Sequence, residues 1–95
     1  MSRPRIVVVD VGEAKDSKQL HDLLAAGFHF PEWSGRNWDA FSDSITTLEP
    51  MPQKIVVRGL AALAVHLPFD AQQLSEILED FRSAPDLAHV RVEIE

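Results

Sequence analysis

The sequence contains no cysteine and only four glycines, and these two shortages exclude several kinds of site. Without cysteine the protein cannot form a disulfide, a catalytic thiol or a cysteine-type zinc site. The glycines, at positions 12, 27, 35 and 59, are isolated, so the sequence lacks the glycine-rich loops that bind nucleotide phosphates. Because a chain without disulfides is suited to a reducing compartment, we expect the protein to be cytoplasmic.

Long apolar runs and clusters of basic residues are also missing. The first apolar run is interrupted at Asp10 and is too short for a signal peptide or a membrane span. Fifteen acidic residues against nine lysines and arginines give a net charge of -6, and the basic residues are scattered. This distribution disfavours direct binding of nucleic acid or membrane. It fits a basic partner, and it fits equally a surface that is acidic for solubility alone.

The remaining composition is that of an ordinary globular protein, with 45% hydrophobic and 25% charged residues in a chain of 95. Such a chain can bury a modest core and is expected to form one domain. No internal repeat, low-complexity segment or linker divides the sequence. Residues 1–95 are therefore predicted to form a single domain.

Three segments rich in β-branched residues predict strands. Residues 5–11 form a continuous apolar run, which is typical of a central strand covered on both faces. Residues 54–60 predict a second strand. Residues 89–95 alternate apolar with charged side chains, which predicts a half-exposed edge strand.

Helical spacing of apolar residues separates these strands. Asp16 and Gln19 are placed as a capping box for a first helix, which Gly27 is expected to end. Asp70 and Gln73 repeat this arrangement for the last helix, which Pro85 ends. Helices are also predicted over residues 38–48 and, as a short helix, over residues 61–67. The alternation of strands and helices predicts an α/β fold with a small three-stranded parallel sheet packed with three to four helices, largely on one face.

The helix predicted over residues 38–48 has one apolar and one polar side. The apolar stripe consists of Trp38, Phe41, Ile45 and Leu48, and the polar side consists of Asp39, Ser42, Asp43 and Thr46. Asn37 is placed to cap the start of this helix. Two carboxylates four residues apart repel each other, by about 0.2–0.5 kcal/mol in an isolated helix. The polar side is therefore a candidate binding face.

Simpler explanations exist for each of these residues. The dipole of the helix favours Asp39 in its first turn, and Asp43 is compatible with a solvated surface carboxylate. Trp33, in the loop before the helix, fits an interface anchor and a cover for the end of the core equally well. A third reading combines His29 and Glu32 with the two aspartates in a metal-dependent hydrolytic site, although no histidine pair has metal-binding spacing.

Residues 16–46 resemble the barstar family, whose members are intracellular protein inhibitors of ribonucleases. The shared features are "LH" in the first helix, then "PE", an aromatic residue, "G", "N", "DA", an aromatic residue and "D", without a gap. "FR" followed by "A" at residues 81–84 is also similar to the family. The resemblance implies a barstar-like fold without catalytic activity or cofactor. It also implies a binding surface formed by the second helix and the preceding loop.

Carried over position by position, the resemblance implies contact roles for Trp33, Gly35 and Asn37. It further implies that Asp39 and Asp43 are the key carboxylates. In the family, such acidic groups take the place of RNA phosphates in the active site of a guanyl-preferring ribonuclease. The complete set of predicted partner-binding residues is Trp33, Gly35, Asn37, Trp38, Asp39, Ser42, Asp43 and Thr46.

The sequence departs from the family pattern at three positions. Arg36 replaces an acidic residue of the loop, Ser42 stands where an aromatic residue is usual, and Ser83 replaces a glutamate. A cation in the loop would face a cationic active site, which favours a different partner or a shifted docking geometry. Of these we expect a related toxin nuclease, rather than barnase itself, as partner. We therefore expect an immunity-type inhibitor of a basic ribonuclease or nuclease toxin, monomeric when free. The alternative is a non-catalytic interaction module of the same fold that regulates another basic protein.

Overall fold

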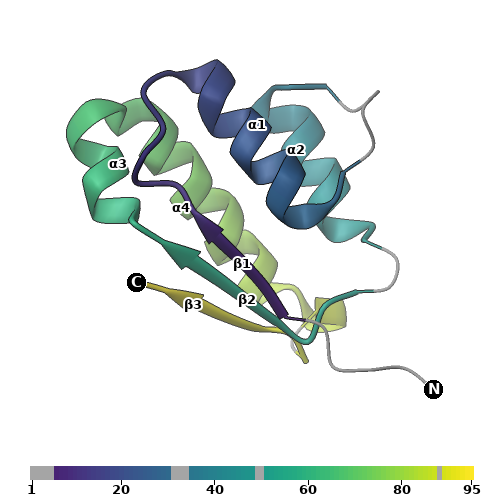
Figure 1. The fold of residues 1–95 in the computed structure, drawn as a ribbon. Helices are drawn as coiled ribbons and strands as arrows, with labels where there is room; N and C mark the ends of the chain where they lie inside the picture. The colour runs from purple at the N-terminus through teal and green to yellow at the C-terminus, as the bar shows by residue number, and fades with distance from the viewer. Residues whose placement is uncertain (1–5, 31–34, 49–50, 88) are drawn as a thin grey trace.

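The computed structural model describes residues 6–30, 35–48, 51–87 and 89–95 (Figure 1). The elements in chain order are β1 (Ile6–Asp10), α1 (Ser17–Phe28), α2 (Trp38–Thr46), β2 (Lys54–Arg58), α3 (Leu60–His66), α4 (Pro68–Ser83), the 3-10 helix η1 (Pro85–Leu87) and β3 (Arg91–Ile94). Within the described ranges no helix has the length and apolar character needed to span a bilayer.

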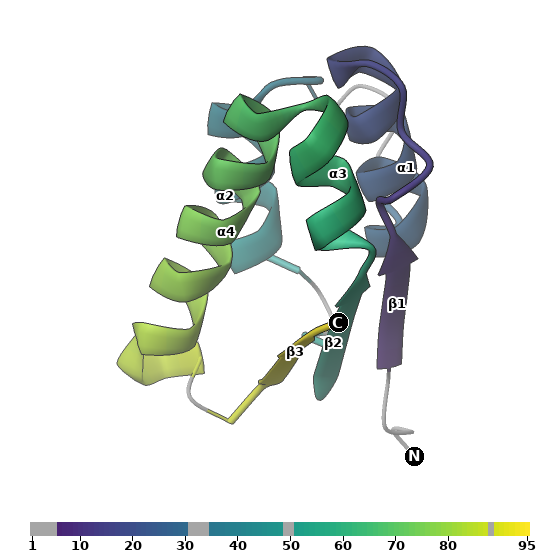
Figure 2. The same cartoon turned by 90° about the vertical axis from the view of Figure 1, so that its left-hand side faces the viewer.

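The three strands form one parallel sheet in the order β1-β2-β3. Each crossover connection leads to a strand that pairs beyond the preceding one, so the sheet grows in a single direction from β1 to β3. Since such crossovers share one hand, their helices are brought to the same face of the sheet. Helices α1, α2 and α4 lie on one side of the sheet (Figure 1 and Figure 2). The predicted α/β fold, with its small parallel sheet and three to four helices on one face, is confirmed.

The position predicted for the first strand is wrong. β1 lies at an edge of the sheet, and its exposed and buried residues alternate. Ile6 and Val8 are 59% and 53% exposed on the face that carries no helix, whereas Val7 and Val9 are buried. The central strand is β2, in which three consecutive residues, Ile55, Val56 and Val57, are buried.

The prediction for the last strand is confirmed, because β3 is an edge strand with one buried side. Val92 pairs with Ile55 in the register of β2 and faces the helices. On the opposite face Lys54 and Glu93 form an ion pair at 3.2 Å, with both side chains about one third exposed. Charged pairs, rather than a second layer of helices, therefore cover part of the outer face.

Glycine 27 does not end the first helix as predicted. α1 continues to Phe28, and His29 follows it in the left-handed region with φ 60°. A Cβ atom on Gly27 would lie 2.4 Å from Cγ2 of Val9. Gly27 is therefore needed because the backbone of α1 packs directly against β1.

The two predicted capping boxes have different outcomes. Asp16 caps α1, and its Oδ1 accepts a hydrogen bond from the Gln19 amide at 2.7 Å. The Gln19 side chain accepts one from the Lys15 amide. Asp70 does not cap α4, which begins two residues earlier at Pro68 with Leu67 as its N-cap residue. Proline at the first helical position is favourable because the missing N–H has no partner there.

A close contact between two glycines joins the ends of β1 and β2. Gly59 follows β2 with φ 78°, a conformation that favours glycine. A Cβ atom on Gly59 would lie 2.7 Å from the amide nitrogen of Gly12 and 2.8 Å from its Cα. Glycine is therefore required at position 59 for two reasons, because the backbone is left-handed and because there is no room for a side chain.

Candidate protein-binding surface

Helix α2 is held with its apolar stripe inward, as the sequence predicts. Phe41 and Ile45 are 2% and 0% exposed, and Trp38 and Leu48 pack against the core while partly exposed. Asn37 caps the helix, because its Oδ1 accepts a hydrogen bond from the Ala40 amide at 2.8 Å. The helix is thus fixed by its cap and by a narrow apolar side.

The opposite side of α2, which we call the acidic face, consists of Asp39, Ser42, Asp43 and Thr46. All four residues are exposed. Asp39 lies in the first turn, where the helix dipole favours a negative charge. Within the described ranges no lysine, arginine or histidine forms an ion pair with Asp39 or Asp43. Both carboxylates are therefore available to donors from another molecule.

The two hydroxyl residues of the acidic face differ in what they offer. The Thr46 hydroxyl donates to the backbone carbonyls of Asp43 at 3.0 Å and Ser42 at 3.3 Å, so its hydrogen is used within α2. The Ser42 side chain is exposed, and it is much smaller than the aromatic side chain that the family pattern predicts there. Compared with that pattern, the acidic face has lost apolar area and kept its charge.

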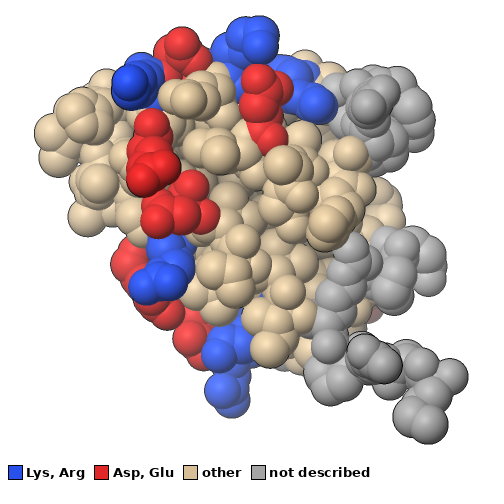
Figure 3. Space-filling model, viewed as in Figure 1, with Lys and Arg blue, Asp and Glu red and all other residues tan. Residues whose placement is uncertain are grey.

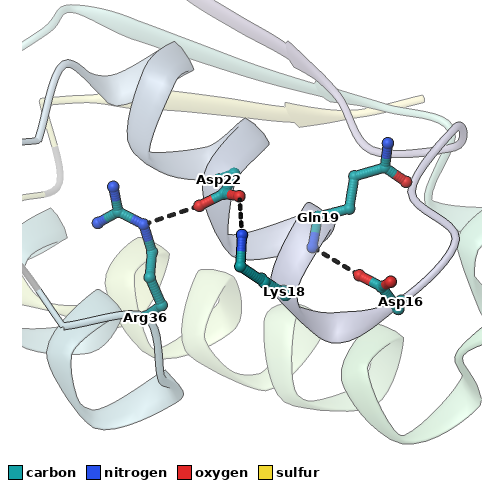
Figure 4. Close-up of polar contacts among 5 residues, drawn as sticks. All are labelled: Asp16, Lys18, Gln19, Asp22 and Arg36. Atoms are coloured by element: carbon teal, nitrogen blue, oxygen red, sulfur yellow. Dashed lines mark hydrogen bonds and ion pairs between the residues drawn. The ribbon is translucent and has the colours of Figure 1, made fainter.

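Arg36 precedes α2 and is bound to α1. Its Nε lies 3.0 Å from Oδ1 of Asp22, and Lys18 Nζ lies 3.2 Å from the other oxygen of the same carboxylate (Figure 4). The hydrogen bonds from Arg36 and from Lys18 lower the pKa of the Asp22 carboxyl. Arg36 and Lys18 therefore share one carboxylate on α1, which offsets part of the positive charge that Arg36 would bring toward a cationic partner.

Trp38 points inward, and this orientation reveals a contact that the sequence does not predict. Its Nε1 donates a hydrogen bond to Oδ1 of Asp70 at 2.9 Å. Ser17 donates its hydroxyl to the other oxygen of Asp70. The indole therefore attaches α2 to α4, and only the exposed remainder of the ring is available to a partner.

The other predicted residues are placed as follows. Gly35 and Asn37 are exposed immediately before α2. Trp33 and Glu32 lie outside the described residues, so the structure does not test their predicted roles. Within the described ranges no three histidine, aspartate or glutamate side chains are grouped closely enough to hold a metal ion.

On the face shown in Figure 3, basic and acidic side chains are interspersed. Arg58 and Glu95 are 3.3 Å apart, and Lys18 and Arg36 share Asp22. Opposite charges that lie side by side cancel at a distance. Several charges outside the acidic face are therefore paired within the molecule.

The imidazole of His21 is buried behind α2, which makes stability depend on pH. Its ring centroid lies 4.5 Å from that of Trp38. Burial lowers the pKa of His21 below its ordinary value of about 6.5, Asp70 opposes this effect, and Arg36 adds to it. The unfolded chain therefore takes up this proton at a higher pH than the folded one. We expect the free energy of unfolding to fall as the pH drops below about 6.5.

Urea unfolding between pH 8 and pH 5 measures this dependence. The His21→Gln variant lacks the titrating group, so its unfolding free energy should fall less steeply over the same range. Equal slopes for the parent and the variant would contradict the prediction.

The parallel sheet and the exposed carboxylates of α2 define a small α/β domain with an acidic helix face. The chain belongs to the barstar family, because the family described as "Barstar (barnase inhibitor)" matches residues 5–94. A relative from Bacillus subtilis (strain 168), named "Putative ribonuclease inhibitor YrdF", is 26% identical over 76 residues, which cover 80% of this chain and 84% of the relative. These similarities support a ribonuclease-inhibitor-like role without catalysis.

Proposed function

We propose that the protein inhibits a basic ribonuclease by placing Asp39 and Asp43 in the cationic site that binds RNA phosphates. The partner is a barnase-like, guanyl-preferring ribonuclease or a related nuclease toxin. The inhibitor acts as a monomer in the cytoplasm and protects the cell as an immunity-type protein. The proposal draws on the family membership and on the geometry of α2.

The observation that carries the proposal is a pair of exposed carboxylates, on one face of α2, that form no ion pair with any cation in the described part of the chain. A carboxylate accepts short, charge-assisted hydrogen bonds from arginine, lysine and protonated histidine. These are the side chains that bind phosphate groups in proteins. Binding also relieves the repulsion between Asp39 and Asp43, because cations of the partner come to lie between or beside them.

The loop residue Arg36 is compatible with such a partner. Its guanidinium is bound to Asp22 on α1, so it meets the ribonuclease as part of an ion pair. The other two departures from the family pattern, at Ser42 and Ser83, put serine in place of an aromatic residue and a glutamate. Both replacements reduce the area that could contact a partner. We therefore expect the partner to complement a smaller apolar surface than barnase does.

A titration of enzyme activity tests the proposal. The protein is added to barnase and to a panel of small, basic, guanyl-preferring ribonucleases, including toxin nucleases. We expect stoichiometric inhibition of at least one enzyme, with an association rate that falls steeply as ionic strength rises. The proposal is contradicted if no enzyme of the panel is inhibited at any ratio of protein to enzyme. It is also contradicted if the association rate does not respond to salt.

A second candidate function is regulation of a basic protein that is not a nuclease. The small Ser42 side chain at the centre of the acidic face favours it, because an anchor residue of the inhibitor family is missing there. Affinity capture with the parent protein and with the Asp43→Asn variant distinguishes the two. Charge-dependent recovery of a basic protein without nuclease activity would support this candidate.

A further inference from the structure

The carboxylate of Asp70 is buried where the first turns of three helices meet. Its residue is 7% exposed, and with His21 it is one of two buried polar or charged residues in the described part of the chain. Trp38 donates to Oδ1 and Ser17 donates to Oδ2. Ser17 begins α1, Trp38 begins α2, and Asp70 lies in the first turn of α4. One side chain therefore joins all three helices.

Both oxygens of the buried Asp70 side chain accept hydrogen bonds. A buried carboxylate is costly unless its oxygens accept hydrogen bonds, and here each oxygen has a donor from a different helix. The amino-terminal ends of helices carry partial positive charge, and three such ends lie around this group. Hydrogen bonds weaken steeply when their angle departs from linear, so two donors that converge on one buried side chain restrict how their helices can move. The contact therefore holds the helices in a defined arrangement.

Helix α2 is short, and its other attachments to the fold are the side chains of its apolar stripe. It is nine residues long and has two buried residues, Phe41 and Ile45. A helix of this length is not stable by itself in water, so its position is set by its contacts. The Trp38 ring adds edge contacts to His21 and Phe41, with centroids 4.5 and 5.6 Å apart. Trp38 is thus held by two rings and by Asp70.

The position of Trp38 determines where the acidic carboxylates point. Asp39 directly follows Trp38, and neighbouring residues are about 100° apart around a helix axis. A rotation or tilt that moves the indole away from Asp70 would turn Asp39 and Asp43 by the same angle. Directional hydrogen bonds to a partner would then be misaligned.

We propose that Asp70 is a positioning residue for the acidic face, acting through Trp38 to fix the rotation of α2. This inference rests on the proposed function, since it concerns how α2 is presented to a ribonuclease. Electrostatic steering depends on charges that remain in place, whereas the lifetime of the complex depends on alignment. Asp70 therefore governs the dissociation rate and leaves the association rate nearly unchanged.

The Trp38→Phe variant tests this role, because it keeps an aromatic ring and removes the N–H that Asp70 accepts. Stopped-flow association and dissociation are measured with the ribonuclease that is bound most tightly in the panel described above. We expect dissociation to become about tenfold faster or more, with association changed less than about twofold. The Asp70→Ala variant, which removes both acceptor oxygens, should add little to the effect of Trp38→Phe on the dissociation rate in a double-mutant cycle, since both interrupt the same contact.

The Ile55→Val variant is the matched control. It removes one buried methyl group from β2 and lowers stability while leaving Trp38 and Asp70 unchanged. An equal increase in dissociation rate for Ile55→Val would overturn the proposal, because loss of stability alone would then explain the effect. Dissociation unchanged in Trp38→Phe would overturn it as well.

Hydrogen exchange of the Trp38 indole N–H, measured by NMR, tests the contact in the free protein. We expect slow exchange in the parent and markedly faster exchange in Asp70→Ala, which lacks the acceptor oxygen. Exchange as fast as that of an exposed indole in the parent would overturn the positioning role and leave the proposed function standing. Conversely, a protected indole in a protein that binds no ribonuclease of the panel would overturn the proposed function, and this role with it.

Discussion

Replacing Asp43 by asparagine should weaken binding of the ribonuclease by about 2–5 kcal/mol, which is on the order of thirty- to several-thousand-fold in Kd. The loss is large because the partner's cation would remain desolvated without its counter-charge. The same variant should unfold with an unchanged or slightly higher free energy, by up to about 0.5 kcal/mol, because the repulsion from Asp39 is removed. Isothermal titration calorimetry and urea unfolding measure the two effects.

A substitution that weakens binding without lowering stability identifies a binding residue, whereas substitution of a structural residue lowers stability as well. Asp39→Asn should weaken binding similarly but cost some stability, since Asp39 lies in the first turn of α2. The matched control is Glu13→Gln, which removes one exposed charge between β1 and α1. Equal losses of affinity for Glu13→Gln and Asp43→Asn would show that only net charge matters, and would exclude specific contacts at the acidic face.

The Gly59→Ala variant should lose about 3 kcal/mol of unfolding free energy or more. The estimate combines a non-glycine residue in the left-handed region with an overlap against backbone, each of which costs about 1–3 kcal/mol. The overlap is severe because the atoms that the new Cβ would meet belong to the backbone of Gly12, which cannot rotate away. Thermal and urea unfolding measure the change.

Asparagine at position 59 separates the two causes. Asparagine tolerates the left-handed conformation better than alanine but has the same Cβ atom. Gly59→Asn should therefore recover only part of the loss. Full recovery would show that the backbone conformation alone requires glycine, and would contradict the close contact between Gly59 and Gly12.

The sequence was sufficient to predict features that depend on neighbouring residues. The spacing of Trp38, Phe41 and Ile45 predicted the side of α2 that is buried, and Asn37 was correctly predicted as its cap. The exposure of Asp39 and Asp43 follows from the same spacing. These features are local because one turn of helix determines them.

Features that depend on distant parts of the chain were predicted wrongly or missed. The apolar run of β1 looks like a central strand, yet its place in the sheet depends on which side of β2 it joins. Gly27 looks like a helix end, yet its role is a contact with Val9. Asp70 looks like a helix cap, whereas its partners, Ser17 and Trp38, belong to two other helices. Periodicity carries no information about such contacts.

The placement of α2 between β1 and β2 in the chain has a consequence for folding kinetics. Parallel pairing of β1 with β2 closes the long segment from Asp10 to Lys54, which contains both α1 and α2. Closing such a segment is slow, because chain entropy is lost before the distant contacts form. The acidic face acquires its orientation only when this closure is complete. If the acidic face binds a partner as proposed, we expect a newly synthesised chain to become competent to bind only late in folding, at a time set by the rate of strand pairing.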